Sequence, residues 1–424
     1  MSITICYYED SKFKKFYPIT YLRPVAVMRA GIMPLFMRAQ RHFNKPIICL
    51  AVRDQIAPMV AAAYADYPVN IIKRDGDDVL FINGRVRDYA DLAKQVAGTR
   101  LSTRFVNNDG ETVGLLFKLE PNCSIGKLAT PADYMNYLTS IRDQVADFDC
   151  DATLYSYPWE VMADIEKEVT ADYNFLRDGF SNEPDVKLHE GSHLVNPDSI
   201  QLGHDVEVRP GAVIDASHGP VYVGPNTRLE SHAAVYGPSY IGPNTVVVAG
   251  KIEKCSIGHT CRVGGEVEES VFQSYVNKYH AGFIGHSYVG SWVNFGAMTT
   301  NSDLKNNYSN IRVSVNGEMI DTGSIKVGSF IGDHTKFGIG TLLNTGINIG
   351  VCCNIFGGSL VTDKEIASFQ WGSSGSFVEY KLEKALETAR RTGERRDYTL
   401  SAAELAALTA ISENRLTDAG TLDF

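Results

Sequence analysis

The sequence IGDHTKFGIGTLLNTGINIGVCCNIFGGSLV (331–361) repeats itself with a period of six residues. The repeating position holds an aliphatic or aromatic residue each time: Ile331, Phe337, Leu343, Ile349, Ile355 and Val361. A period of six fits neither an α-helix, with about 3.6 residues per turn, nor an alternating strand, with a period of about two. It is typical of a parallel β-helix, in which each hexad forms one flat side of a coil and its apolar residue points inward. The sequence therefore predicts a β-helix in this part of the chain.

The same period occurs upstream, so the predicted β-helix is long. It is regular at Val223, Leu229, Val235, Ile241 and Val247, and hexads that are more widely spaced occur at Leu202, Val208, Ile214, Ile257 and Val263. We place this domain at residues 198–370, with one inserted loop at 301–328 in which Asn316-Gly317 predicts a hairpin turn. An insertion in a solenoid projects from one face, which is often the binding face.

Residues 1–180 lack the six-residue period and alternate between apolar runs and helical patterns. We expect strands at 3–8, 46–52 and 78–84, and helices at 33–43, 54–65 and 131–147. This alternation predicts an α/β domain with a doubly wound, mostly parallel sheet. Ligands bind such sheets beyond the carboxyl ends of the strands, here near residues 8–12 and 83–88.

Two segments complete the predicted organisation. Residues 181–197 are polar and predict a linker, and residues 371–424 predict a short α-helical tail. The last coil of a solenoid exposes strand edges and core, so we expect the tail to cap that coil or to touch a neighbouring subunit.

Composition excludes several classes of protein. The chain of 424 residues has a net charge of −10, which is unfavourable for general nucleic-acid binding. Its eight cysteines include no Cys-x-x-Cys pair, which indicates reduced, structural thiols. The N-terminus becomes charged by residue 9, and no apolar run approaches the length of a membrane span. We therefore expect a cytoplasmic protein that binds neither nucleic acid nor membrane.

Several motifs resemble one known family. They include YPITYLRPVAVMRAG (17–31), DVLFINGRV (78–86), NKYHAGFIGHSYVG (277–290) and IGDHTKFGIGTLLNTG (331–346). In these motifs the chain is similar to the bifunctional sugar-1-phosphate nucleotidyltransferase/acetyltransferases, and most closely to a divergent branch of sugar nucleotidyltransferases. The resemblance covers most of residues 1–365. It implies a nucleotidyltransferase-like domain, a left-handed β-helix, and a homotrimer with an acyl-CoA cleft between adjacent β-helices.

The resemblance implies nucleotidyl transfer from a nucleoside triphosphate to a sugar 1-phosphate, with Mg²⁺ as cofactor. The glycine-rich phosphate loop of the family is replaced here by a segment without glycine, and its Gly-Asp metal pair is replaced by Asn83-Gly84-Arg85. An amide and a cation remove the hard oxygen charge that Mg²⁺ prefers. The remaining candidates for binding nucleotide or phosphate are Arg23, Arg29, Asn83, Gly84 and Arg85, and the weak candidates for the metal are Asp88 and Asp172.

For the β-helix, the resemblance implies acetyl transfer from acetyl-CoA to an amino-sugar phosphate. His280 is the expected general base, because it precedes Asn294 at the spacing of the family's catalytic histidine and substrate-binding asparagine. We expect Lys278 to project to the same side as His280 and to meet an anionic sugar phosphate. The expected substrate-binding residues are Lys278, Phe283, Asn294, Asn301 and Asp303.

Three interpretations remain open at this stage. In the first, both transferase activities are present. In the second, only one is present, and the N-terminal domain is a non-catalytic binder of nucleotide sugars. In the third, the β-helix is a trimerisation or regulatory module of a pyrophosphorylase and has no chemistry of its own. Most other histidines stand beside hexad corners and predict hydrogen bonds there, without the paired spacing of a metal site.

Overall fold

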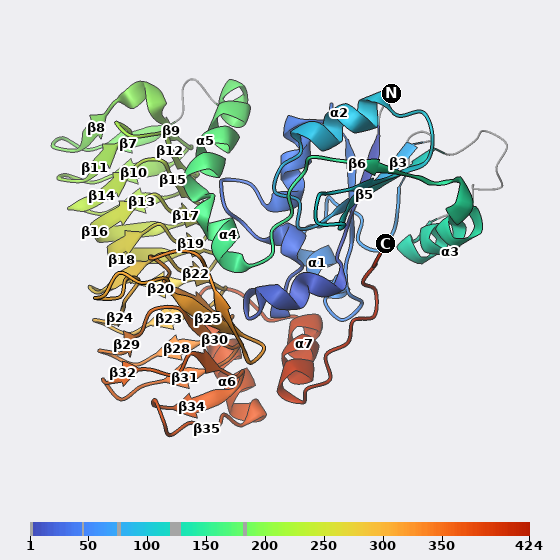
Figure 1. Cartoon of the computed structure of the whole chain (residues 1–424). Coiled ribbons are helices and arrows are strands. Elements are labelled where there is room, and N and C mark those ends of the chain that lie inside the picture. Colours follow the sequence, from blue (N-terminus) through green and yellow to red (C-terminus); the bar gives the residue numbers. More distant parts are fainter. Residues whose placement is uncertain (1–2, 45, 74–77, 119–128, 181–184) are drawn as a thin grey trace.

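The computed structural model describes residues 3–44, 46–73, 78–118, 129–180 and 185–424. A long β-helix lies beside an α/β domain, and the C-terminal helices lie between the two at one end (Figure 1). Within these described residues, no helix is both long and apolar enough to span a bilayer. Residues 181–184 of the predicted linker lie outside the described residues.

The α/β domain is built on one six-stranded sheet in the order β2-β1-β3-β5-β4-β6. Its strands are β1 Thr4–Tyr8, β2 Ile47–Ala51, β3 Asp78–Asn83, β4 Thr103–Val106, β5 Thr112–Lys118 and β6 Ala146–Asp149. All neighbouring pairs are parallel except those that β5 makes with β3 and β4. The predicted mostly parallel sheet is therefore confirmed.

Both faces of this sheet are covered. In β1, Ile5 and Tyr7 pack into one apolar cluster while Cys6 and Tyr8 pack into another on the opposite face. A strand buried on both sides reads as a continuous apolar run, which is why β1 was recognisable in the sequence. The helices of the domain that pack near the sheet are α1 Ala57–Ala63, α2 Ala90–Gly98 and α3 Pro131–Ile141, with short 3-10 helices that include Ser11–Phe16, Ile19–Tyr21, Val25–Val27 and Leu35–Arg41. Two further helices, α4 Pro158–Ala163 and α5 Ile165–Leu176, lie along the β-helix and contact β22 and β15 (Figure 1).

The β-helix is a three-sided prism. Face 1, toward the α/β domain, contains β9 Ile200–Leu202, β12 Val221–Val223, β15 Ser239–Ile241, β17 Ser256–Ile257, β19 Val271–Phe272, β22 Tyr288–Val289, β27 Ser329–Ile331, β30 Ile347–Ile349 and β33 Glu365–Ile366. Face 2 contains β7 Val186–Leu188, β10 Val206–Val208, β13 Arg228–Leu229, the first parts of β16 Val246–Glu253 and β18 Arg262–Glu268, β20 Asn277–Lys278, β23 Asn294–Phe295, β28 Lys336–Phe337, β31 Asn354–Ile355 and β34 Gln370–Gly372. Face 3 contains β8 His193–Val195, β11 Val213–Asp215, β14 Ala233–Tyr236, the second parts of β16 and β18, β21 Phe283–Gly285, β24 Thr300–Asn301, β29 Leu342–Leu343 and β32 Leu360–Val361.

The structure differs from the prediction in the start of the β-helix and in the type of one helix. The β-helix starts earlier than residue 198, because β7 already pairs with β10 and β8 with β11. Most of the predicted linker is thus the first coil, whose short strands are largely exposed. At 33–43 the helix is a 3-10 helix over Leu35–Arg41.

The inserted loop and the tail also have clear structures. The loop forms the predicted hairpin, β25 Arg312–Val315 and β26 Glu318–Asp321, and its turn residues Asn316 and Gly317 both have positive φ. The tail helices are α6 Leu382–Glu394 and α7 Ala402–Ser412. They share an apolar cluster with the last coils and with Leu22 of the α/β domain, so the tail joins the two domains as well as covering the end of the prism.

Each coil of the prism contributes inward side chains to one continuous core. We predict that Ile349→Ala, which removes a fully buried side chain from face 1, lowers the free energy of unfolding by about 2–5 kcal/mol through lost burial and a residual cavity. Ile325→Ala removes the same atoms from an exposed site in the inserted loop and should change it by no more than about 0.5 kcal/mol. Urea unfolding followed by circular dichroism measures both, and equal losses would contradict the inward placement of the hexad residues.

Candidate functional site

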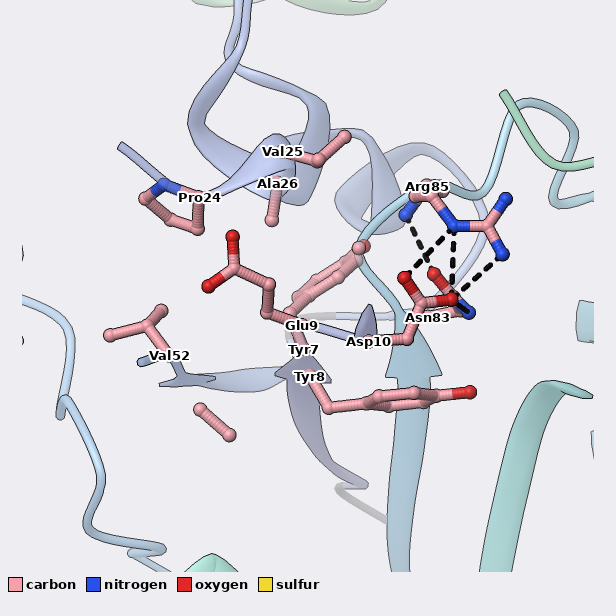
Figure 2. Close-up of a pocket in the computed structure, with 12 residues that line it drawn as sticks. Tyr7, Tyr8, Glu9, Asp10, Pro24, Val25, Ala26, Val52, Asn83 and Arg85 are labelled. Atoms are coloured by element: carbon pink, nitrogen blue, oxygen red, sulfur yellow. Dashed lines mark hydrogen bonds and ion pairs between the residues drawn. The ribbon is translucent and has the colours of Figure 1, made fainter. Parts of the chain in front are cut away.

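The carboxyl ends of β1, β2 and β3 meet at one edge of the α/β domain, where the sequence predicts a nucleotide site. The space there is only about 10 Å³, which is room for about one water molecule (Figure 2). Glu9, Asp10, Asn83, Gly84 and Arg85 line it together with apolar residues. In this conformation the edge is filled by the protein's own side chains.

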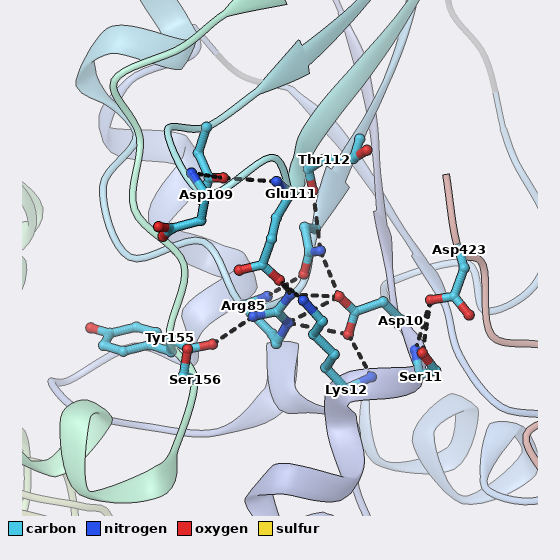
Figure 3. Close-up of polar contacts among 12 residues, drawn as sticks. Asp10, Ser11, Lys12, Arg85, Asp109, Glu111, Thr112, Tyr155, Ser156 and Asp423 are labelled. Carbon is cyan, nitrogen blue, oxygen red and sulfur yellow. Dashed lines mark hydrogen bonds and ion pairs between the residues drawn. The ribbon is translucent and has the colours of Figure 1, made fainter. Parts of the chain in front are cut away.

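Arg85 is the centre of this filled edge. Its guanidinium donates to Asp10 Oδ2 at 2.7 Å, to Glu111 Oε1 at 2.7 Å and to the carbonyl of Tyr155 at 2.9 Å (Figure 3). Lys12 forms a second ion pair with the same Glu111 carboxylate. The cation therefore lies between two carboxylates and is neutralised by them.

The polar groups next to Arg85 also have partners within the protein. The Asn83 amide donates to Asp10 Oδ2 at 2.9 Å and accepts from the Arg85 N–H at 3.0 Å. A Cβ on Gly84 would lie 3.1 Å from the Tyr8 carbonyl, so the close approach of two strand ends favours glycine there. Burial raises the pKa of Glu9 to about 7, although its ion pair with Arg53 acts in the opposite direction.

The two predicted metal ligands do not come together. Asp88 is exposed and accepts the Ala90 N–H at the start of α2. Asp172 is fully buried, accepts the N–H groups of Ile32 and Met33 at 2.8 and 2.9 Å, and forms an ion pair with Arg41. No cluster of three His, Cys, Asp or Glu side chains suited to a metal occurs among the described residues. The residues present do not fit Mg²⁺, and the prediction of Asp88 and Asp172 as its ligands was wrong.

Two of the predicted phosphate-binding arginines, Arg23 and Arg29, contact the β-helix. Arg23 forms a buried, bidentate ion pair with Asp333 of the β-helix and also donates to Ser291 Oγ at 3.2 Å. The backbone N–H and carbonyl of Arg29 bind the Tyr288 hydroxyl at 2.8 and 3.0 Å, and the guanidinium lies 5.4 Å from the centre of the Tyr240 ring. Arg23 and Arg85 are thus neutralised by carboxylates of the protein itself.

On the β-helix, His280 lies at the corner between faces 2 and 3. Its side chain is exposed, and it has no hydrogen bond or ion pair within the described part of the chain. Its ring packs edge-on against Tyr279, with 5.4 Å between the centroids. An imidazole held only by its backbone and one ring contact is free to bind a substrate.

Lys278 does not share the surface with His280, contrary to expectation. It pairs with Val263, so it occupies an inward position that neighbouring coils fill with apolar residues. The side chain is 1% exposed and donates to the carbonyls of Gly264 and His280 at 3.0 and 2.5 Å. Burial lowers the pKa of Lys278 to about 8. Because a buried ammonium is costly without partners, its role here is to hold the corner at His280.

Asn301 is a second polar residue in an inward position. Paired with Leu343, it is 2% exposed, and its amide accepts from the Gly285 N–H at 2.8 Å and donates to the Gly285 carbonyl at 3.0 Å. Asn301 therefore ties together neighbouring coils at Gly285, the end of β21. We had expected it to contact a substrate at the surface, but its side chain is buried.

Asp303 likewise has an internal partner. Its Oδ2 lies 2.8 Å from His286 Nδ1, while Glu269 Oε2 lies 3.1 Å from His286 Nε2. Burial would lower the pKa of His286, but the two carboxylates outweigh this effect and raise it from 6.5 to about 9. This charged triad fixes the start of the inserted loop. The sequence indicated only a corner histidine, because neither carboxylate is close to it in sequence.

Two predicted residues remain near the surface. Asn294 is half-buried, and its Oδ1 accepts from the Asn277 amide at 2.8 Å. Phe283 is half-buried, and its ring lies against Gly285, where no Cβ would fit. Both stand in the coils around His280.

Large exposed apolar residues surround the same corner on successive coils. Ile339 is the most exposed, at 77% of its surface, and the others are Tyr279, Met298, Leu342, Phe356 and Leu360. Isolated exposed apolar residues are common, but a group of this size indicates an interaction surface. We call these six residues the apolar corner.

Comparison with known proteins supports the resemblance seen in the motifs. Residues 5–181 match the family model described as sugar nucleotidyl transferase. A bifunctional sugar-1-phosphate nucleotidylyltransferase/acetyltransferase of Sulfurisphaera tokodaii is 31% identical over 207 residues, which are 48% of this chain and 44% of that protein. The bifunctional protein GlmU of Acholeplasma laidlawii is 30% identical over 196 residues, which are 41% of this chain and 38% of that protein. The matches thus span less than half the length of either relative, and the predicted resemblance to bifunctional nucleotidyltransferase/acetyltransferases is confirmed.

A solved structure of LpxA from Acinetobacter baumannii covers 49% of this chain and 77% of its own, with 18% sequence identity and a TM-score of 0.30.

The His286 triad predicts a pH-dependent stability. Because the folded pKa of about 9 is above the ordinary value of 6.5, the stabilisation is complete below pH 6.5 and is lost as pH rises through 9. We expect the difference in unfolding free energy between the wild type and His286→Gln to fall by on the order of 2–3 kcal/mol over that range. Urea titrations at pH 6 and pH 9.5 measure it, and subtracting the variant cancels groups such as Lys278 that titrate in both proteins. A difference that does not change with pH would contradict a charged His286.

Proposed function

We propose that this protein is a transferase that moves an acyl group from acyl-CoA to an amino-sugar phosphate, with His280 as the general base. The observation that carries the proposal is the construction of the His280 corner. Lys278, a buried polar residue, interrupts the apolar core and donates to the carbonyl of His280, whose imidazole is exposed and unpartnered; a second buried polar residue, Asn301, binds Gly285 at the end of the following strand. Departures from a fold's local rules concentrate at functional sites.

The chemistry requires one proton transfer and one acyl transfer. His280 accepts a proton from the substrate amine, the amine nitrogen forms a bond to the thioester carbonyl carbon, and the carbon–sulfur bond breaks. The proton then goes to the departing CoA thiolate. Acetyl-CoA is the proposed co-substrate, as the names of the bifunctional relatives suggest. Asn294 and Phe283 are the proposed substrate contacts, because both are partly exposed in the coils around His280.

Lys278, Asn301 and Asp303 act as positioning residues in this proposal. Lys278 holds the His280 carbonyl, Asn301 holds Gly285, and Asp303 is held by His286 at the start of the inserted loop. An acceptor site that had Lys278 as its phosphate ligand is excluded by the burial of that side chain.

We further propose that the active form is a homotrimer in the cytoplasm. The apolar corner would pack against a second β-helix, and the cleft between the two would hold the acyl-CoA beside His280. Burying Ile339, Leu342 and Leu360 in this way removes apolar surface from water, which is the main driving force for protein association.

Nucleotidyl transfer from a nucleoside triphosphate to a sugar 1-phosphate is the second candidate function. The match of residues 5–181 to sugar nucleotidyl transferases favours it. The geometry opposes it, because Arg85 and its carboxylate partners fill the edge and the predicted metal ligands lie apart. We therefore propose the α/β domain as a non-catalytic partner of the β-helix.

Loss of the imidazole tests the acyl-transfer proposal. His280→Ala should lower the rate of CoA release from acetyl-CoA with glucosamine 1-phosphate by about 10²–10⁴-fold, the usual contribution of a general base. A thiol-reactive dye measures the release. The matched control is His218→Ala, which removes another exposed histidine far along the prism and should not change the rate.

The same samples report on the alternatives. Equal CoA release by the wild type and His280→Ala would reject His280 as the base and leave the β-helix as an assembly module. Release of pyrophosphate from UTP or dTTP with a sugar 1-phosphate would establish the second candidate function.

The apolar corner predicts the assembly. Ile339→Asp places a charge at the centre of the proposed interface, so the mass measured by sedimentation should fall from that of a trimer to that of a monomer. Ile325→Asp makes the same substitution at another exposed isoleucine, in the inserted loop, and should leave the mass unchanged. A monomeric wild type, or a trimeric Ile339→Asp, would reject this interface.

A further inference from the structure

A second, larger cavity lies where the three parts of the molecule meet. Its volume is about 420 Å³, within the range of small-molecule sites. Its walls come from α1 and the Leu22–Val27 region of the α/β domain, from the corner between faces 1 and 2 of the prism, and from α7 with the residues before it. These segments lie next to one another in Figure 1, and His280 is not among the lining residues.

The prism wall of this cavity has unusual corner residues. Earlier coils place Asn226 and Asn244 at this corner with positive φ, a conformation that asparagine tolerates. Further along, the same position holds Tyr275, Trp292 and His334, with φ of 60°, 63° and 61°. The rings stack, with 3.9 Å between Tyr275 and Trp292 and 6.1 Å between Trp292 and His334. Positive φ recurs at this corner in other coils, as at Thr260 and Cys352, so the stacked rings, and not the backbone conformation, distinguish the cavity wall.

The cavity also contains polar groups that have no partner. His334 is 6% exposed, and its Nδ1 is buried without a hydrogen bond. The hydroxyls of Tyr64 and Ser274, which also line the cavity, donate to no group within the described part of the chain. Burial lowers the pKa of His334 well below 6.5 and that of His259 to about 4. Each neutral imidazole offers one donor and one acceptor.

The residues that line the cavity leave no positive charge free. Arg23 is the cation that lines it, and its guanidinium is bound bidentately by Asp333. The Glu404 carboxylate accepts from the Tyr398 hydroxyl and the Ser401 N–H. No uncommitted Lys or Arg side chain lines the cavity in the described residues. A phosphate placed here would lose its hydration without gaining a cation.

We infer that this cavity binds an uncharged heteroaromatic ring, namely the base of a free nucleoside. A nucleobase has two apolar faces and a rim of donors and acceptors. The apolar walls at Val60, Ala63 and Leu408, together with the aromatic rings, match the faces. The Nδ1 of His334, the Nε2 of His259 (whose Nδ1 contacts Thr260 Oγ1 at 3.1 Å) and the Tyr64 hydroxyl match the rim. A sugar carries hydroxyl groups on every edge and would leave several of them against the apolar walls unpaired.

The site is independent of acyl transfer at His280. Because the ligand would touch the α/β domain, the prism and the tail together, its binding would stabilise their packing. The nucleoside therefore links the three parts of the molecule without entering the acyl-transfer cleft.

Calorimetric titration with adenosine, guanosine, cytidine and uridine tests the inference on the full-length protein. We expect saturable binding of at least one nucleoside, and a rise in Tm with the same nucleoside. Ala63→Trp fills the cavity from the end of α1 and should weaken binding at least about tenfold. Ala61→Trp is the matched control, because Ala61 is exposed on the same helix but does not line the cavity.

A second variant keeps the test valid if Ala63→Trp does not fold. His334→Asn retains a residue that accepts positive φ while removing the imidazole, and it should also weaken binding. The inference fails if no nucleoside binds the wild type, or if Ala63→Trp and Ala61→Trp bind equally. It also fails if the nucleoside 5′-monophosphate binds more tightly than the nucleoside, or if glucose binds with the same dependence on Ala63→Trp.

Discussion

The structure depends on the filling of a narrow prism by one inward side chain from each hexad. Successive coils approach so closely that a Cβ on Gly332 would lie 2.7 Å from the backbone of Gly350. Backbone hydrogen bonds between coils therefore leave little freedom, and the inward side chain must match the space available. Lys278 and Asn301 are accommodated because their polar atoms bind backbone groups of the neighbouring coils. The rigidity of the prism is thus what holds the His280 corner in place.

The second constraint is the compensation of charge at the α/β domain. Burying Arg23, Arg53 and Arg85 would be prohibitive without partners, and each faces a carboxylate that is itself largely buried. Removing one member of such a pair leaves an isolated buried charge, so these contacts favour one arrangement of the groups that they join. Arg23 is especially informative, because its partner Asp333 belongs to the prism and lies 310 residues away in the chain.

What the sequence could predict was set by the range of each interaction. Local patterns were sufficient for the prism, for the strands β1, β2 and β3, and for the Asn316-Gly317 turn, because period and turn chemistry act over a few residues. The inward position of Lys278 could not be predicted, since the coils around it are shorter than three full hexads and the phase is lost. The partners of Arg23 and His286 were inaccessible for a different reason: each ion pair joins segments that only the folded chain brings together.

The filled edge of the α/β domain and the cavity between the domains differ in the ligands that they can accept. A triphosphate at the ends of β1 and β3 would meet the carboxylates of Asp10, Glu111 and Glu9. The nearby cations Arg85, Lys12 and Arg53 are already paired with these carboxylates. Like charges at this distance repel, so the phosphates would have to displace the carboxylates before binding. The cavity beside Arg23 offers a phosphate no free cation either, because Arg23 is neutralised by Asp333 and the Glu404 carboxylate adds a negative charge. It differs from the edge in having room and aromatic and apolar walls, which suit the uncharged ligand that we propose for it.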